Sequence, residues 1–338
     1  MSMYLGDLNA RARGLGTRLL SQEELSRLTR ARSLFSLQRE MRGLGLVGTE
    51  APATPGALEA AIRGRAAHLM AILSRWCNDE RRPVFAVILE DEERRAIQMI
   101  LRGADQGAAA EARMSGIVPT ANLSERALGA LAAQPTMADV VRMLVLWDHP
   151  FGRALIGVTA GARPSLFETE IELQRAFAER ASLRARQGGP ELVAYVEQLV
   201  DLTNLWTALL HFPERAPELA QVMFIEGGRA IDRPLFDDLC NAERLEHAQD
   251  LAARTFRGSP IGTALTGDAR PLSSLESAVL EAQIAEQKRH ARTRPQSAAP
   301  LIAFSLQLRA EVLNLRRIIW GVALEAPAPL VQSEMVAT

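Results

Sequence analysis

The sequence predicts an all-α protein built from three related helical segments. Apolar residues recur at helical spacing along nearly the whole chain, and no stretch alternates convincingly between apolar and polar residues as a strand would. In addition, several patterns recur at an interval of about 110 residues, which indicates an internal repeat.

The composition supports packed helices and argues against several classes of function. The 338-residue chain is 48% apolar but only 5% aromatic, so Leu, Ile, Val and Ala fill most of its core. A formal net charge of −1 leaves no basic surplus for neutralising phosphates, so we expect no nucleic-acid partner. Cys77 and Cys240 are the only cysteines, which argues against a disulfide framework or a zinc ribbon and suits a reducing cytosol.

The chain is expected to be soluble, although it could still sit on a membrane-embedded partner. Segment 1–20 mixes charged residues into its apolar ones and has no signal-peptide core. No run reaches the roughly 18 apolar residues of a spanning helix, so we expect no direct insertion into the bilayer.

Pro and Gly breakers separate the expected helices. The expected ranges are 17–42, 57–79, 84–103, 123–132, 136–147, 166–187, 190–211, 233–241, 243–256, 272–292 and 299–322. Pro150 is expected to open a further helix. The tail after Pro327 is expected to be loose, apart from a short turn over 330–335.

Two patterns define the repeat. PFGRAL at 150–155 recurs as PIGTAL at 260–265. An acidic helix motif occurs three times, as Glu93-Arg-Arg-Ala96-Ile97, Asp201-Leu-Thr-Asn204-Leu205 and Glu311-Val-Leu-Asn314-Leu315, with the acids 108 and 110 positions apart. The repeat predicts three domains, at 1–112, 113–220 and 221–338.

Tandem similar domains have a geometric consequence. Each presents the same two unlike faces, so neighbours dock head to tail, and such contacts form a ring when the rotation closes. We therefore expect pseudo-three-fold symmetry and a funnel with a central hole. An open solenoid is the competing outcome.

Each motif helix carries its carboxylate on its apolar face. The residues four, seven and eight positions after the acid are apolar, and in a helix these positions lie on the same face as the acid. A buried carboxylate must find partners, since burying it unpaired is costly. We predict structural polar clamps that fix how one helical hairpin packs on the next, at Glu93, Asp201, Asn204, Glu311 and Asn314. A proton or metal site is disfavoured because no His or second carboxylate is expected to converge there.

No catalytic pattern is present, so we expect a non-enzymatic chain without cofactor or metal. The only lysine, Lys288, follows no glycine-rich loop, the five histidines lack metal-ligand spacing, and no Gly-x-Ser-x-Gly elbow occurs. Asp148-His149 is an adjacent acid–base pair, but adjacent side chains rarely face each other. Glu168, Glu170 and Glu172 are expected to form a solvated first helical turn.

The third motif and the start of the chain resemble a known family. Glu311-Val-Leu-Asn-Leu-Arg-Arg-Ile-Ile-Trp-Gly321 resembles the signature of the C subunit of archaeal and bacterial A/V-type ATPases, called subunit d in eukaryotes. The opening from Tyr4, with Asn9-Ala-Arg11 before a short basic and apolar helix, looks like the start of that family. The resemblance covers residue 4 to about 334. The chain departs from the family at Ala96, usually Asn, at His211, usually Gly, and in lacking the Lys that commonly follows the Gly at 321.

The resemblance implies a non-catalytic rotor connector. Such a funnel receives the central shaft, made of D- and F-type subunits, and sits on the cytoplasmic face of the proteolipid rotor ring as a peripheral subunit, transmitting torque between ATP turnover and ion translocation. Arg102, Arg316 and Arg317, beside the ends of motif helices, are candidate interface or clamp residues. One alternative is a helical repeat adaptor that binds a partner in its concave surface. A prenyl-transferring enzyme is a weaker alternative, because the Asp-rich metal motifs it needs are missing.

Overall fold

The computed structural model describes residues 4–77, 81–161, 163–211, 222–266 and 272–337. Within these ranges all regular secondary structure is α-helical, which confirms the predicted fold class. The helices are α1 (Gly6–Gly16), α2 (Gln22–Leu28), α3 (Leu34–Gly43), α4 (Pro55–Ser74), α5 (Arg82–Asp105), α6 (Ala110–Arg113), α7 (Glu125–Ala132), α8 (Met137–Leu146), α9 (Pro150–Thr159), α10 (Leu166–Gly188), α11 (Pro190–His211), α13 (Arg233–Cys240), α14 (Leu245–Thr255), α15 (Pro260–Leu265), α16 (Leu272–Thr293), α17 (Ala299–Ala323) and α18 (Ala328–Ser333).

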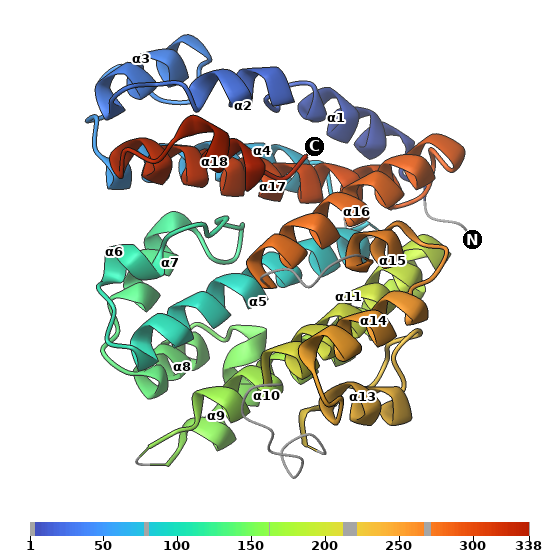
Figure 1. Cartoon of the computed structure of the whole chain (residues 1–338). Coiled ribbons are helices and arrows are strands. Elements are labelled where there is room, and N and C mark those ends of the chain that lie inside the picture. The colour runs from blue at the N-terminus through green and yellow to red at the C-terminus, as the bar shows by residue number, and fades with distance from the viewer. Residues whose placement is uncertain (1–3, 78–80, 162, 212–221, 267–271, 338) are drawn as a thin grey trace.

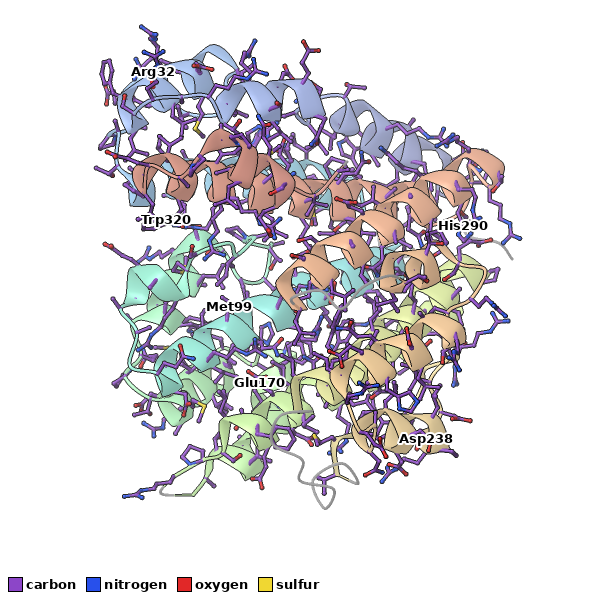
Figure 2. All side chains as sticks on the ribbon, viewed as in Figure 1. Arg32, Met99, Glu170, Asp238, His290 and Trp320 are labelled. Carbon is purple, nitrogen blue, oxygen red and sulfur yellow. The ribbon has the colours of Figure 1, made fainter. Side chains whose placement is uncertain are left out.

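The helices stack so that the two ends of the chain meet. α1, α2 and α3 lie along one edge of the molecule beside α17 and α18, and α9 and α13 lie at the opposite edge (Figure 1). α1 and α3 both contact α17, although nearly the whole chain separates them in sequence. Side chains fill the space between the layers; Arg32 and Asp238 lie toward the periphery, whereas Met99 and Glu170 lie nearer the middle (Figure 2).

One order of helix lengths occurs three times. Short helices of 7 to 8 residues (α2, α7, α13) are followed by helices of 10 to 11 residues (α3, α8, α14). A long pair of 20 to 25 residues per helix completes each set: α4 with α5 directly, and α10 with α11 and α16 with α17 after one additional helix, α9 or α15. The last helix of each pair carries the acidic motif. The predicted domain boundaries remain predictions, since the one at 112/113 falls inside α6 and the one at 220/221 lies outside the described residues.

The predicted single helix over 17–42 is wrong. The Ser21 hydroxyl accepts a hydrogen bond from the Glu24 amide at 3.2 Å, and the Glu24 carboxylate accepts one from the Ser21 amide at 2.8 Å. Ser33 and Ser36 form the same reciprocal pair. A capping box begins a new helix because it satisfies amides that have no partner inside the helix. The segment therefore divides into α2 and α3, and α1 precedes them.

The prediction of a loose tail is also wrong, although the short turn expected over 330–335 overlaps a helix. The chain after Pro327 forms α18, and Val331, Met335 and Val336 are buried. Val331 and Met335 are four residues apart and share a helical face. Gly321 of α17 allows the close approach, because a Cβ there would lie 2.5 Å from Val331 Cγ2.

Buried apolar side chains form two large clusters. The larger joins α1–α5, α7–α10, α17 and α18 to the first half of α11 and part of α16, while the smaller joins α13–α15 to the second half of α11 and another part of α16. Ile97, Leu205 and Leu315, each four residues after a motif acid, are at most 1% exposed. The apolar face expected on each motif helix is therefore a core face.

The repeated Pro-x-Gly pattern has a steric explanation. A Cβ on Gly152 of α9 would lie 2.7 Å from the Val145 amide nitrogen, and one on Gly262 of α15 would lie 2.2 Å from the Phe256 carbonyl oxygen. Both glycines let a helix cross closely over the end of the preceding helix, α8 or α14.

We predict that Gly152→Ala lowers the free energy of unfolding by about 1–3 kcal/mol, because backbone atoms must move to accept the methyl group. The matched control is Gly157→Ala in the same helix. Gly157 is exposed with no atom near its Cβ position, so alanine there raises helix propensity and stabilises by about 0.5–1 kcal/mol. Urea unfolding followed by circular dichroism measures both, and equal effects would contradict the close-crossing explanation.

Candidate functional site

The carboxylates of the three motif helices all bind the segment that precedes a short capped helix. Glu93, fully buried on α5, accepts hydrogen bonds from Thr120 Oγ1 at 2.7 Å and Asn122 Nδ2 at 3.0 Å, just before α7. Asp201 on α11 accepts the backbone amides of 229–231 at 2.9 to 3.1 Å, just before α13. The two contacts are thus alike in place although their donors differ.

Glu311 makes the corresponding contact across the whole chain. Its carboxylate accepts the Leu20 amide at 2.6 Å, just before α2, and forms an ion pair with Arg65 of α4. A second contact joins the same regions, because Asn9 Nδ2 donates to the carbonyls of Pro295 at 3.0 Å and Ser297 at 2.9 Å, between α16 and α17. The C-terminal motif helix therefore holds the start of the chain.

Burial raises the pKa of Asp201 and of Glu311. The amides of Ile231, Ala230 and Arg229 oppose this rise at Asp201, and Arg65 and the Leu20 amide oppose it at Glu311.

The side-chain amide of each motif asparagine both donates a hydrogen bond to, and accepts one from, the backbone of a single residue. Asn204 donates to the Ile225 carbonyl at 2.9 Å and accepts the Ile225 amide at 3.0 Å. Asn314 makes the same pair with Val336, both at 2.8 Å. Both asparagines are fully buried. The first motif has Ala96 at this position, so its helix lacks the contact.

The expectation that no histidine approaches a motif acid is wrong. His149 is buried, and its Nε2 lies 3.3 Å from Glu93 Oε2. Its Nδ1 accepts the Phe151 amide at 3.3 Å, which leaves Nε2 as the protonated nitrogen facing the carboxylate. Asp148 turns away to pair with Arg153 in solvent, so the adjacent acid and base do not face each other.

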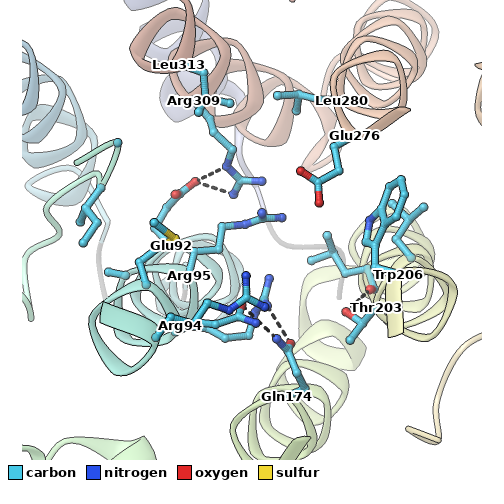
Figure 3. Close-up of a pocket in the computed structure, with 18 of the residues that line it drawn as sticks. Glu92, Arg94, Arg95, Gln174, Thr203, Trp206, Glu276, Leu280, Arg309 and Leu313 are labelled. Carbon is cyan, nitrogen blue, oxygen red and sulfur yellow. Dashed lines mark hydrogen bonds and ion pairs between the residues drawn. The ribbon is translucent and has the colours of Figure 1, made fainter. Parts of the chain in front are cut away.

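A cavity of about 410 Å³ opens between α5, α11 and α17, with α10, α16 and segment 115–118 completing its wall (Figure 3). The motif helices line it with the same three positions, counted from the acid. These are Arg95, Thr203 and Leu313 at position +2, Gln98, Trp206 and Arg316 at +5, and Met99, Thr207 and Arg317 at +6. Each motif helix thus has one face in the core and another on the cavity.

All three candidate interface arginines line this cavity. Arg102 pairs with both carboxylate oxygens of Glu170 on α10 at 2.5 and 2.8 Å, which corrects the prediction of a fully solvated turn there. The Glu170 contact raises the pKa of Arg102. Arg317 donates to Ser277 Oγ at 2.8 Å and to the Glu334 carbonyl, and burial lowers its pKa. Arg316 only approaches Glu59, at 3.7 Å.

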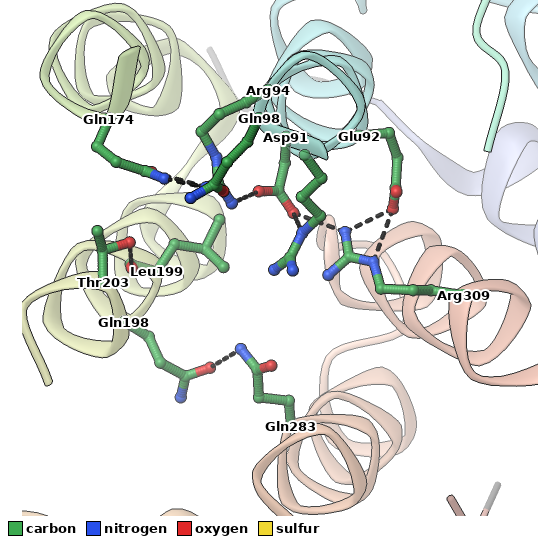
Figure 4. Close-up of polar contacts among 11 residues, drawn as sticks. Asp91, Glu92, Arg94, Gln98, Gln174, Gln198, Leu199, Thr203, Gln283 and Arg309 are labelled. Atoms are coloured by element: carbon green, nitrogen blue, oxygen red, sulfur yellow. Dashed lines mark hydrogen bonds and ion pairs between the residues drawn. The ribbon is translucent and has the colours of Figure 1, made fainter. Parts of the chain in front are cut away.

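The sequence did not predict a buried ionic cluster, most of whose members form part of the cavity wall. Arg309 of α17 donates to Asp91 at 2.6 Å and to Glu92 at 2.9 Å, both on α5 (Figure 4). Asp91 also accepts Arg94 at 2.6 Å, and Arg94 donates to Gln174 of α10 at 2.7 Å. The cluster links three helices from different thirds of the chain. One signal was available: Asp91 and Arg309 each lie two residues before a motif acid, so the repeat alignment pairs opposite charges.

Charge compensation in this cluster is strong. Burial acts to raise the pKa of Asp91, but Arg95, Arg309 and Arg94 hold it well below its ordinary value. The same carboxylates raise the pKa of Arg309 against the effect of its burial. Asp91 and Arg309 are therefore both held in their charged forms at neutral pH.

Neither a metal cluster nor a membrane span is found in the part of the chain that the structure describes. No group of three His, Cys, Asp or Glu side chains there could hold a metal ion. No described helix is long and apolar enough to cross a bilayer.

The described part of the chain is thus all-helical, with three acidic motif helices around one cavity. The family model of the ATP synthase (C/AC39) subunit matches residues 8–332. The chain belongs to this family, and membership implies a non-catalytic subunit of a V/A-type ATPase. No curated individual protein matches the sequence.

We predict that Asn204→Ala lowers the free energy of unfolding by about 2–6 kcal/mol, because it leaves the buried amide and carbonyl of Ile225 without partners at about 1–3 kcal/mol each. Thr207→Ala on the cavity face of the same helix is the control, with an expected change within about 0.5 kcal/mol. Chemical unfolding monitored by tryptophan fluorescence measures both. A loss at Asn204 no greater than at Thr207 would refute the role of the asparagine contact.

Proposed function

We propose that the chain is the rotor connector of its V/A-type ATPase. In this role its cavity receives the tip of the central shaft of D- and F-type subunits, and another face rests on the cytoplasmic side of the proteolipid ring. The observation that carries the proposal is the cavity between α5, α11 and α17, which the three motif helices line at equivalent positions. The contact of Glu311 with the Leu20 amide supports it, because this contact ties the last motif helix to the N-terminal part of the chain.

The contacts between helices suit a part that transmits torque. A connector must rotate as one body, so its helices must not slide past one another under load. Dense packing resists deformation, and the ion pairs of Arg309 with Asp91 and of Arg65 with Glu311 resist sliding, because moving either side leaves a buried charge unpaired. We propose that the predicted clamps act in this way, within three domains arranged as a pseudo-three-fold funnel.

The alternative function is an adaptor that binds a peptide in its concave surface. The contact of Glu311 with the Leu20 amide disfavours it, because an open solenoid leaves its two ends apart. A pulldown with the tagged chain from detergent-solubilised membranes distinguishes the two. Shaft and ring subunits are expected in the bound fraction, whereas recovery of the chain without any rotary ATPase subunit would contradict the rotor proposal.

We predict that Glu311→Leu uncouples the complex. The change strands Arg65 and the Leu20 amide, which destabilises the chain by about 3–5 kcal/mol and loosens its closure. ATP-driven ion pumping should then fall several-fold relative to ATP hydrolysis in reconstituted vesicles. Glu111→Leu, at an exposed position on α6, is the control and should leave the ratio unchanged. Normal assembly with an unchanged pumping ratio in the Glu311 variant would defeat the clamp mechanism.

A further inference from the structure

The three walls of the cavity carry different charges. Six arginines and three glutamates line it, and every one of those arginines comes from α5 or α17: Arg94, Arg95, Arg102, Arg309, Arg316 and Arg317. α11 contributes no charged residue, and its lining side chains are Leu199, Leu202, Thr203, Trp206, Thr207 and Leu210. Equivalent positions on similar helices thus differ sharply in chemistry.

Two of the arginines have only a single long ion pair and keep much of their side chains exposed. Arg94 and Arg309 belong to the buried cluster with Asp91 and Glu92, and Arg102 is held by Glu170. Arg95, in contrast, reaches Asp91 only through Nε at 3.3 Å, and Arg316 approaches Glu59 only at 3.7 Å. Their side chains remain 42% and 41% exposed, and Arg95 extends into the open space of the cavity (Figure 3).

We propose that the cavity binds an acidic turn or helix end of the shaft in one orientation, with its carboxylates toward Arg95 and Arg316 and its apolar side toward α11. This inference rests on the proposed function and adds the chemistry and the register of the partner. A socket with three similar walls offers three nearly equivalent orientations, and a charge present on two walls but not on the third removes that ambiguity.

The size and lining of the cavity favour the tip of a protein over a whole shaft or a free anion. A volume of about 410 Å³ is in the range of pockets that hold a small ligand, so only a turn or a helix end enters. A free anion would make no favourable contact with the apolar side of the wall at Trp206 and Leu210, whereas a protein segment can present acidic and apolar side chains together. Arg316 can form two parallel hydrogen bonds to a carboxylate.

The test measures binding of the full-length chain to the purified shaft subunits of its own complex by surface plasmon resonance. Arg316→Glu should weaken binding about tenfold or more, mainly by slowing association, and Arg316→Gln should weaken it about threefold. Arg126→Glu, on the exposed outer side of α7, is the control and should bind like the unaltered chain. Circular dichroism melting verifies that each variant is folded.

A double variant tests the register. Arg316→Gln combined with Thr207→Arg restores the total cavity charge but places it on the α11 wall. Binding should stay at the level of Arg316→Gln alone or fall further. Recovery to the original affinity would show that only total charge matters, and the orientation would be overturned.

Salt dependence supplies a measurement that needs no variant. Association of the unaltered chain with the shaft should slow markedly between about 0.05 and 0.3 M salt, and that of Arg316→Glu should slow less over the same range, because Arg95 remains. Shaft binding that depends neither on salt nor on Arg316 would overturn the charge complementarity and leave the connector function intact.

Absence of shaft binding by the unaltered chain would contradict both the charge complementarity and the connector function. Thermal stabilisation by millimolar inorganic phosphate that requires Arg316, with shaft binding insensitive to it, would mark a small-anion site and also overturn the proposal.

Discussion

The structure depends on one repeated interaction, in which a buried carboxylate in the middle of a long helix binds the chain just before a short capped helix. Each long helix would otherwise expose or strand its acid, since an unpaired buried carboxylate is far less stable than one with two or three donors. Thr120 and Asn122 supply the donors for Glu93, and backbone amides supply them for Asp201. Because Glu311 makes the same kind of contact with Leu20, the interaction also joins the two ends of the chain.

The buried ionic cluster adds a second kind of connection. Ion pairs of this kind contribute little net stability, because desolvation offsets much of their attraction. They are nevertheless demanding in geometry, and displacement of Arg309 from Asp91 and Glu92 would leave several charges unpaired in the interior. Such a cluster suits a protein whose helices must keep their relative positions under load. The connector function that we propose for this member of the ATP synthase (C/AC39) subunit family would use that rigidity.

The cavity shows that similar helices can present different surfaces. Its three long helices share the acid and the apolar core face, whereas the equivalent position on the cavity face is Arg316 on α17 and Trp206 on α11. The core face is restrained by packing density, but the cavity face is free to vary with whatever occupies it. Charge placement on that face is accordingly where the three helices are least alike.

Periodicity and internal repetition alone determined the helical class, the three motif helices and the burial of Ile97, Leu205 and Leu315, because amphipathic spacing is a local property of the chain. The same reasoning merged α2 with α3, since an apolar pattern continues through a capping box, and treated the tail as loose, since nothing local reveals that Val336 reaches Asn314. Only the tertiary structure decided which donors meet each acid, that His149 faces Glu93, and that Asp91 and Arg309 form one cluster. Those contacts join residues tens to hundreds of positions apart, and their partners are set by how whole helices pack rather than by any neighbour in sequence.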